Sequence, residues 1–337
     1  MRNIYDLTIK ELEDYFISIN EKKFRAVQVY EALYKRRIKS FDDMTNISKE
    51  VREKLKQDFS FYKIKMLIKQ QGKNVNKYLF ELEDGNKIES VLMFHDYGTS
   101  ICVSSQVGCN MTCAFCESGR LKKVRNLLAY EIVQQILQIE EDINKRITHV
   151  VLMGIGEPFD NYDNVLRFVK IINCGKGIDI GSRHITISTC GVIPGIKKFM
   201  NEEGQINLAI SLHAPNDTLR SRIMPINKAY PLNELMETIK EYINKTNRRV
   251  TFEYIMLDNV NDSEENAKEL ALLLKGINCY VNLIPYNETE NIEFKRTKEW
   301  KIMKFYDILK KNKINVTIRK EFGGSVDAAC GQLRANN

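Results

Sequence analysis

The 337-residue sequence lacks any long apolar run, and its charged start, MRNIYDLTIKELEDYF, has no apolar signal core. Because a membrane-spanning helix needs roughly 20 apolar residues, we expect a cytoplasmic protein with no membrane segment. Only six prolines and 17 glycines are present, and repeats and low-complexity segments are absent, which leaves little room for a disordered linker. With 43% hydrophobic and 28% charged residues, the composition is that of a soluble globular protein.

A nearby fourth cysteine is missing from the run CVSSQVGCNMTCAFC, where Cys109, Cys113 and Cys116 are spaced C-x3-C-x2-C. Structural metal sites are normally closed by four protein ligands, and a [4Fe–4S] cluster takes four thiolates. Three cysteines therefore leave one position open for a small molecule. In a reducing compartment such clustered cysteines indicate metal binding or catalysis. Three others lie in apolar or strand-like surroundings and are interpreted as small buried side chains: Cys174, Cys190 and Cys279.

A dinucleotide-binding fingerprint is also missing, because the segment 154–158 (GIGEP) lacks the third glycine and has an acid where a pyrophosphate would lie. From residue 100 onward, apolar strand-like runs alternate with helical stretches. This alternation predicts a parallel sheet, and six such units favour an open βα barrel over a doubly wound sheet. The strand-like runs are 100–105, 149–156, 183–189, 207–213, 250–257 and 280–287.

The first hundred residues follow other patterns. Helical spacing of apolar residues predicts three helices before residue 60, the third opened by Ser48. The alternating stretch that follows surrounds an Asp84-Gly85-Asn86 turn, which predicts a β-hairpin. We therefore expect a helical domain at 1–60, a β-hairpin linker region at 61–98 and the barrel at 99–337.

The net charge of +7 is concentrated near the end of the chain. Residues 295–320 contain ten Lys or Arg residues against two acids, Glu299 and Asp307, so that the rest of the chain is close to neutral. Such a segment is compatible with a solvated helix face and with binding to a phosphate backbone.

Polar residues recur where the predicted parallel strands end. They are Gly156 with Glu157, Ser188, Ser211 with His213, and Asn287. The carboxyl ends of parallel barrel strands converge on one face, where ligands bind. Alone, each residue is typical of a turn or a cap; beside the cysteine run, the set predicts a ligand-binding face.

The cysteine run followed by βα units resembles the radical S-adenosylmethionine (SAM) superfamily. More narrowly, the chain resembles the RlmN/Cfr family of adenine-methylating RNA enzymes over nearly its whole length. The matching segments include VLMGIGEPFDNYDNV, HITISTCGVIP, LAISLHAPND, MPINKAYP and DAACGQLR. The resemblance implies an α/β fold: a partial (βα)6 radical SAM barrel, a β-hairpin connection and a small N-terminal helical accessory domain. That domain would bind RNA phosphates through Lys22, Lys23, Arg25, Lys35, Arg36 and Arg37.

The resemblance also implies the roles of individual residues. Cys109, Cys113 and Cys116 would hold a [4Fe–4S] cluster, with SAM on its open iron. The SAM pocket would comprise Gly156, Glu157, Ser188, Ser211, Leu212, His213 and Asn287. On the C-terminal catalytic loop Cys330 would become S-methylated, Cys102 would form a transient disulfide with it, and Glu89 would accept a proton. Each turnover would use two SAM molecules, and a cytosolic electron donor would reduce the disulfide.

Within this family, RlmN-type enzymes methylate carbon 2 of an adenine in the peptidyl-transferase centre of 23S rRNA, and often a tRNA adenine beside the anticodon. Cfr-type enzymes methylate carbon 8 of the same rRNA adenine. Pro158 after Glu157 favours the first type. The segment 117–120 (ESGR) departs from the small, uncharged residues expected after the third cysteine, which bears on substrate position and on tRNA activity. The alternatives outside the family are a noncatalytic RNA-binding protein with a zinc or iron–sulfur site, and a radical SAM activase or dehydrogenase acting on protein.

Overall fold

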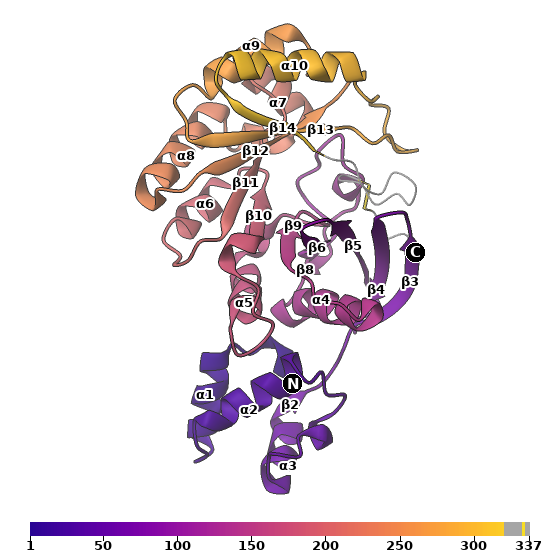
Figure 1. The fold of residues 1–337 in the computed structure, drawn as a ribbon, viewed down its shortest axis with the longest axis vertical. Coiled ribbons are helices and arrows are strands. Elements are labelled where there is room, and N and C mark those ends of the chain that lie inside the picture. Colours follow the sequence, from indigo (N-terminus) through magenta and orange to yellow (C-terminus); the bar gives the residue numbers. More distant parts are fainter. Residues whose placement is uncertain (320–331, 334–337) are drawn as a thin grey trace.

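The computed structural model describes residues 1–319 and 332–333. Its centre is a ten-stranded sheet in the order β14-β13-β12-β11-β10-β9-β6-β5-β4-β3 (Figure 1). From β6 to β14 each strand is parallel to its neighbours. These strands are β6 (Gly98–Cys102), β9 (His149–Leu152), β10 (Ile185–Thr189), β11 (Asn207–Ser211), β12 (Val250–Met256), β13 (Cys279–Pro285) and β14 (Asn315–Ile318).

Helices connect the parallel strands in the alternation that the sequence predicts, so the α/β barrel is confirmed. They are α4 (Ala129–Ile143), α5 (Tyr162–Asn173), α6 (Ile193–Phe199), α7 (Asp217–Ile223), α8 (Leu232–Thr246), α9 (Glu264–Leu273) and α10 (Glu299–Lys311). Two short strands, β7 (Gln106–Val107) and β8 (Arg125–Asn126), pair with each other on either side of the cysteine loop. None of the helices in the described ranges is long and apolar enough to cross a membrane.

The side chains of each parallel strand alternate between two environments, as strand geometry requires. In β10, Ile185 and Ile187 are fully buried in the core beneath the helices. Thr186 lies between them in sequence and Ser188 follows Ile187, and both line cavities in the barrel interior. Strand β12 repeats the pattern with Phe252 in the core. The outward rows therefore hold the barrel together, and the inward rows are free to carry polar groups.

One strand of the parallel part of the sheet, β14, was not predicted from the sequence. The basic segment 295–320, treated above only as a cluster of charge, contains both α10 and β14. Its positive charges are also partly neutralised within the fold. Lys301 Nζ lies 2.9 Å from Asp258 and 3.3 Å from Asp262, and Lys304 pairs with Glu264.

The predicted hairpin is present, and it widens the barrel sheet. It consists of β4 (Val75–Glu81) and β5 (Lys87–His95), and β3 (Lys65–Gln71) pairs with β4 at the edge. Gly85 turns the chain with a φ of 81°, a conformation that glycine adopts without steric cost. Because β5 pairs with β6, these antiparallel strands continue the same sheet.

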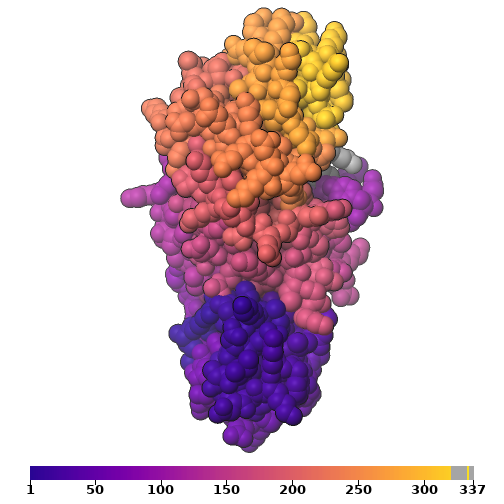
Figure 2. Space-filling model, turned by 90° about the vertical axis from the view of Figure 1, so that its left-hand side faces the viewer, coloured from indigo at the N-terminus to yellow at the C-terminus, as the bar shows by residue number. Residues whose placement is uncertain are grey.

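The three predicted N-terminal helices are α1 (Ile9–Ser18), α2 (Phe24–Tyr34) and α3 (Lys49–Asp58), beside a small pairing of β1 (Arg2–Asn3) with β2 (Phe59–Ser60). They form a lobe at one end of the elongated molecule (indigo in Figure 2). Tyr30 and Arg37 join this lobe to the barrel, by contacts to Ile171 O and Glu140. Several of its basic residues have acidic partners inside the lobe: Lys23 with Glu13, Arg25 with Glu21, and Lys35 with Glu31.

Candidate active site

A cavity of about 120 Å³ lies at the carboxyl ends of the parallel strands. Its wall contains all three clustered cysteines, Cys109, Cys113 and Cys116, with Phe115 between the last two. Five of the predicted ligand-binding residues line the same cavity: Gly156, Glu157, Ser188, Ser211 and His213. The convergence expected from strand ends is therefore present.

The glycines of the 154–158 segment allow two stretches of backbone to approach closely. A Cβ on Gly154 would lie 2.7 Å from the carbonyl carbon of Val103. Gly156 has a φ of 111°, and a Cβ there would lie 2.7 Å from Cβ of Gln106. Both glycines thus let the end of β9 pack against the segment that leads into the cysteine loop.

Glu157 is buried, and its two carboxylate oxygens each accept a backbone N–H. Oε1 accepts from Phe159 at 2.9 Å, and Oε2 accepts from Cys190 at 2.8 Å. Burial raises the pKa of Glu157, and these two hydrogen bonds oppose that rise. A carboxylate has further lone pairs, so Glu157 can tie the ends of β9 and β10 together and still accept a bond from a ligand.

His213 is held in the neutral form. Its Nδ1 accepts the backbone N–H of Ile255 at 3.0 Å, which leaves the ring proton on Nε2. Burial, together with the nearby cation Arg220, lowers the pKa of His213 to about 3. Its ring meets the ring of Phe115 edge-on, with centroids 4.8 Å apart. His213 can therefore donate a hydrogen bond to a ligand but carries no charge.

Arg220 is a fully buried cation behind this wall, and the sequence analysis missed it. Its guanidinium donates to the carbonyl oxygens of Cys190 (2.7 Å) and Leu212 (3.2 Å) and to Oδ1 of Asn227 (2.9 Å). It thereby fixes the ends of β10 and β11, and its charge favours the thiolate form of Cys113.

The comparisons with known proteins agree with this geometry. Residues 2–60 match the family described as "Ribosomal RNA large subunit methyltransferase N-terminal domain", and residues 103–271 match "Radical SAM superfamily". A "Probable dual-specificity RNA methyltransferase RlmN" of Spiroplasma citri is 53% identical over 100% of this chain and 98% of its own length. A protein of the same name from Enterococcus faecalis is 54% identical, covering 99% and 96%. The chain belongs to the RlmN family of radical SAM methyltransferases.

A solved structure supports the same assignment. The "radical SAM methyltransferase from Sphaerobacter thermophilus" is 41% identical to this chain, and the two cover each other completely with a TM-score of 0.94. Streptococcus suis SuiB bound to S-adenosylmethionine shares only the fold, with 16% identity, a TM-score of 0.51, and coverage of 67% of this chain and 51% of its own. The activase-type alternative is thus replaced by a methyltransferase.

A [4Fe–4S] cluster and SAM are the cofactors of an RlmN-family radical SAM enzyme, and the cysteine wall fits such a cluster. Burial and mutual repulsion between thiolates raise the pKa of Cys109 to about 12 and that of Cys113 well above the ordinary value. Such thiols need a cationic partner to ionise. In the described ranges, no three or more His, Cys, Asp or Glu side chains are grouped so as to hold one single metal ion. Thiolates that bind separate irons of one cluster are expected to be spaced more widely than ligands of one zinc.

Among the wall residues of the RlmN-family cavity that were not predicted are two that carry ionisable groups, Cys190 and Glu253. Cys190 is buried, as expected, but it lines the cavity. Glu253, on β12, is 4% exposed, and burial raises its pKa. Neither residue was predicted to line the cavity, because the sequence of one apolar segment does not show which of its residues faces the barrel interior. Leu212 lies in the core beneath the helices and Asn287 is outside the lining residues, so their contacts with SAM stay predictions.

Cys102 and Glu89 lie on one face of the sheet beside this cavity. Val91 pairs with Cys102, so Glu89, two residues earlier on β5, points to the same side. Glu89 is buried and its Oε1 lies 2.8 Å from Nζ of Lys77. Leu333 packs with Cys102 in one apolar cluster. Cys330 lies outside the described residues.

The departure after the third cysteine is a short 3-10 helix, Glu117–Arg120. Gly119 is required there, because a Cβ would lie 2.8 Å from the carbonyl oxygen of Cys113. Ser118 donates to the carbonyl oxygen of Leu333 at 2.6 Å, which ties the C-terminal segment to the cysteine loop. Glu117 is buried, and Asn291 donates to its Oε2 at 3.5 Å. The carboxylate of Glu117, which the sequence comparison did not lead us to expect, is therefore buried within the protein.

Proposed function

We propose that this RlmN-family enzyme methylates carbon 2 of an adenine in 23S rRNA, and an adenine beside the anticodon in tRNA, in the cytoplasm. The observation that carries the proposal is the cavity in which three cysteines meet Glu157, Ser188, Ser211 and His213. The relatives, which match this chain over nearly its whole length, are described as dual-specificity RNA methyltransferases. We propose carbon 2 and not carbon 8 as the methylated position, because Pro158 follows Glu157 as in RlmN-type sequences.

The cavity residues would divide the binding of cluster and SAM between them. Cys109, Cys113 and Cys116 would ligate three irons, leaving the fourth for the amino and carboxylate groups of SAM. When bound, the cluster supplies the electron that starts radical chemistry on SAM. Glu157 suits the ammonium group, while the neutral His213 donates a hydrogen bond without repelling the sulfonium.

The methyl carrier would be Cys330, which accepts a methyl group from a first SAM as its thiolate. Radical chemistry supplied by the second SAM would remove one hydrogen from the S-methyl group, so that its carbon can bond to carbon 2 of the adenine. Glu89 would then take the ring proton, and one electron would pass back to the cluster. The thiolate of Cys102 would attack the Cys330 sulfur and break its bond to the new methylene carbon, which takes up a proton and leaves as the methyl group of the RNA; the resulting disulfide would be reduced by a cytosolic electron donor. The shared sheet face of Glu89 and Cys102, and the packing of Leu333 on it, support this assignment.

RNA binding would involve the N-terminal lobe and the exposed lysines of α10. Lys22 and Arg36 are exposed on the lobe, and the target base would leave its stack to enter the barrel. Some basic side chains of the N-terminal lobe and of α10 already form ion pairs with acidic residues of the protein. Contacts with RNA phosphates would therefore come from the exposed basic side chains that remain.

The direct test is chromatography with mass spectrometry of rRNA and tRNA from cells with and without the gene. We expect 2-methyladenine in both RNAs to depend on the gene. Chromatographic separation is essential, since 2- and 8-methyladenine have the same mass. A product found only at carbon 8 would contradict the carbon-2 assignment, and loss from rRNA alone would remove tRNA from the proposal.

The role of Cys102 has a separate test. Replacing it by alanine removes the resolving thiol, so a covalent protein–RNA adduct should accumulate, detectable as a shifted band that ribonuclease shortens. Cys279→Ala is the matched control, since Cys279 is buried in the outer core. Normal turnover without an adduct would contradict the resolving role.

A further inference from the structure

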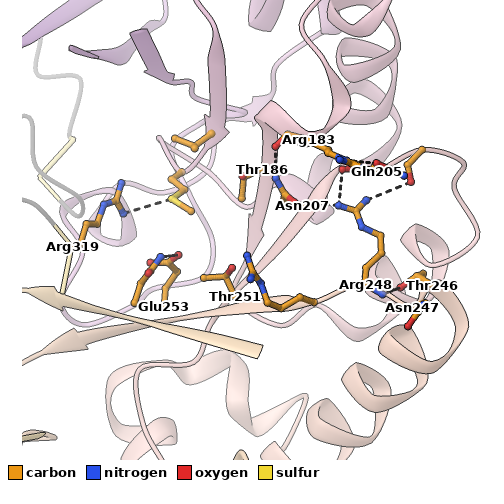
Figure 3. A pocket seen from close by; sticks show the side chains of 15 residues that line it. Arg183, Thr186, Gln205, Asn207, Thr246, Asn247, Arg248, Thr251, Glu253 and Arg319 are labelled. Atoms are coloured by element: carbon orange, nitrogen blue, oxygen red, sulfur yellow. Dashed lines mark hydrogen bonds between the residues drawn. The ribbon is translucent and has the colours of Figure 1, made fainter. Parts of the chain in front are cut away.

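A second, larger cavity opens at the opposite end of the barrel. Its volume is about 860 Å³, within the range of small-molecule sites. Its rim comes from residues just before β10, β11 and β12, among them Arg183, Gln205 and Arg248 (Figure 3). These are the amino ends of the strands, whereas the cysteine cavity lies at their carboxyl ends.

The wall of this lower cavity is polar. Thr186 of β10, Asn207 of β11, Thr251 of β12 and Asn282 of β13 all line it and are only partly buried. The interiors of closed βα barrels are normally filled with branched apolar side chains. A ring of hydroxyl and amide groups instead offers hydrogen bonds to a polar ligand.

The rim is cationic. Arg183, Arg248 and Arg249 all line it, and none of them forms a hydrogen bond or ion pair with a carboxylate of the described residues. Arg183 donates to Gln205, and Arg248 donates to the carbonyl oxygen of Gln205 at 2.6 Å and to Asn207 at 3.1 Å. The guanidinium of Arg249 stacks 3.9 Å from the ring centroid of Tyr280. A concave rim of like charges focuses its field on an anion.

The floor provides an independent sign of a ligand. Glu253 is 96% buried, and its Oε1 accepts from Asn282 at 3.0 Å, but its Oε2 has no hydrogen-bond partner among residues 1–319 and 332–333. Buried polar atoms are rarely left unpaired, so this oxygen calls for a donor from outside the protein. With Met153 and Arg319, Glu253 borders both cavities and forms the layer between them.

We propose that the lower cavity binds a phosphate monoester of mononucleotide size. Its phosphate would lie against Arg183 and Arg249, since guanidinium groups bind phosphate through paired hydrogen bonds. A hydroxyl or amino group at its other end would donate to Oε2 of Glu253. Arg249 precedes β12 and lies four positions before Glu253, a rise of about 13 Å, which is comparable to the length of a nucleoside monophosphate. The proposal does not depend on the methylation reaction.

Isothermal titration calorimetry on the full chain with its cluster reconstituted tests the site. The probes are AMP, adenosine and inorganic phosphate, each with saturating SAM so that AMP cannot report on the cysteine cavity. We expect AMP to bind about tenfold or more tightly than adenosine, because a charge-assisted hydrogen bond contributes about 1.5–3 kcal/mol. AMP binding no tighter than that of adenosine would overturn the proposal.

Three variants locate the binding. The double variant Arg183→Gln with Arg249→Gln should weaken AMP binding at least about tenfold, and Glu253→Gln should weaken AMP more than inorganic phosphate. The matched control is Lys268→Gln with Lys275→Gln, two exposed lysines outside the cavity lining. Equal effects of the rim variant and the control would sink the site.

A second arm identifies the source of the phosphate. A short RNA is compared with and without its 5′-phosphate on the same variants. Binding that requires the 5′-phosphate and is lost in the Arg183/Arg249 variant would support the site and identify an RNA end as its ligand, whereas AMP binding alone would identify a free nucleotide.

Discussion

The two ends of the barrel interior are built from the same four strands, β10 to β13, yet they differ in almost every property. At the carboxyl ends, Ser188, Ser211, Ile255 and Ile284 enclose about 120 Å³ against the cysteine loop. Two to four residues earlier on the same strands, polar side chains line the lower cavity of about 860 Å³, whose rim carries arginines. They are Thr186, Asn207, Thr251 and Asn282. Glu253 lies at the boundary.

This difference shows how little sequence separates two kinds of site. Because inward-facing positions recur every second residue, one step along an inward row changes which cavity a side chain lines. The upper end is lined by thiols and a neutral histidine, whereas the lower end presents positive charge. Substitutions at either end, or in the layer between, should therefore have separable effects.

The largest effect is expected at the cysteine wall. Cys113→Ala removes one of the three proposed cluster ligands, so the visible absorbance of the reconstituted cluster should be largely lost and the methylation of RNA should be abolished. Cys279→Ala, a buried cysteine outside both cavities, should retain both. A Cys113 variant that keeps its cluster and its activity would contradict the ligand assignment.

Next in size is the buried cation behind that wall. Arg220→Met leaves the carbonyl oxygens of Cys190 and Leu212 without their donor, and should lower the free energy of unfolding by about 3–5 kcal/mol. Arg222→Met on the same helix, where the side chain is exposed, should change it by less than about 0.5 kcal/mol. Urea unfolding of both variants measures the contrast; equal losses would remove the structural role of Arg220.

A smaller loss is expected where backbone approaches backbone. Gly156→Ala places a Cβ 2.7 Å from Cβ of Gln106 at a φ of 111°, which should cost about 1–3 kcal/mol and weaken SAM binding. At Gly181 an added Cβ meets nothing within 4 Å, so Gly181→Ala should be nearly neutral. Thermal unfolding and equilibrium dialysis of SAM separate the two effects. If both alanines behave alike, close packing is not the reason for Gly156.

The smallest expected effect is a pH dependence at the boundary layer. Burial raises the pKa of Glu253, while Arg319 and the hydrogen bond from Asn282 oppose the rise. Between the ordinary carboxyl pKa and the raised one, the folded state binds a proton that the unfolded state does not, so stability falls as pH rises through that window. Glu253→Gln should remove this slope and gain stability relative to the wild type between pH 5 and pH 7. Urea unfolding of both proteins at pH 5 and pH 7 measures the change. If the difference in free energy of unfolding between variant and wild type is the same at both pH values, the raised pKa of Glu253 is contradicted.

Much of the cysteine cavity could be predicted because its signals are local. The C-x3-C-x2-C spacing, the glycines before Glu157 and the polar residues at strand ends are readable within a few residues each, and five of the seven expected SAM-pocket positions line the cavity. The roles of Cys330, Cys102 and Glu89 came from resemblance and stay predictions, although Cys102 and Glu89 do share a sheet face.

Other features depend on contacts between distant segments. In the sequence, Arg220 is one charged residue among several in a short helical segment. Only in the folded protein does its guanidinium contact the carboxyl ends of β10 and β11. Strand β14 was hidden in a basic segment because its four residues are too few to outweigh the charges around them. The hairpin was predicted, but its continuation into the barrel sheet required the pairing of β5 with β6.

By itself, then, the sequence determined the βα alternation and the family, and it predicted the ligand set of the cysteine loop, since spacing and periodicity are properties of the chain alone. Only the tertiary structure decided which end of the barrel each inward side chain faces, which charges are neutralised, and that Glu253 is buried with one oxygen unpaired among the described residues. Burial and electrostatic environment arise from residues far apart in sequence, and these set the chemistry of both cavities.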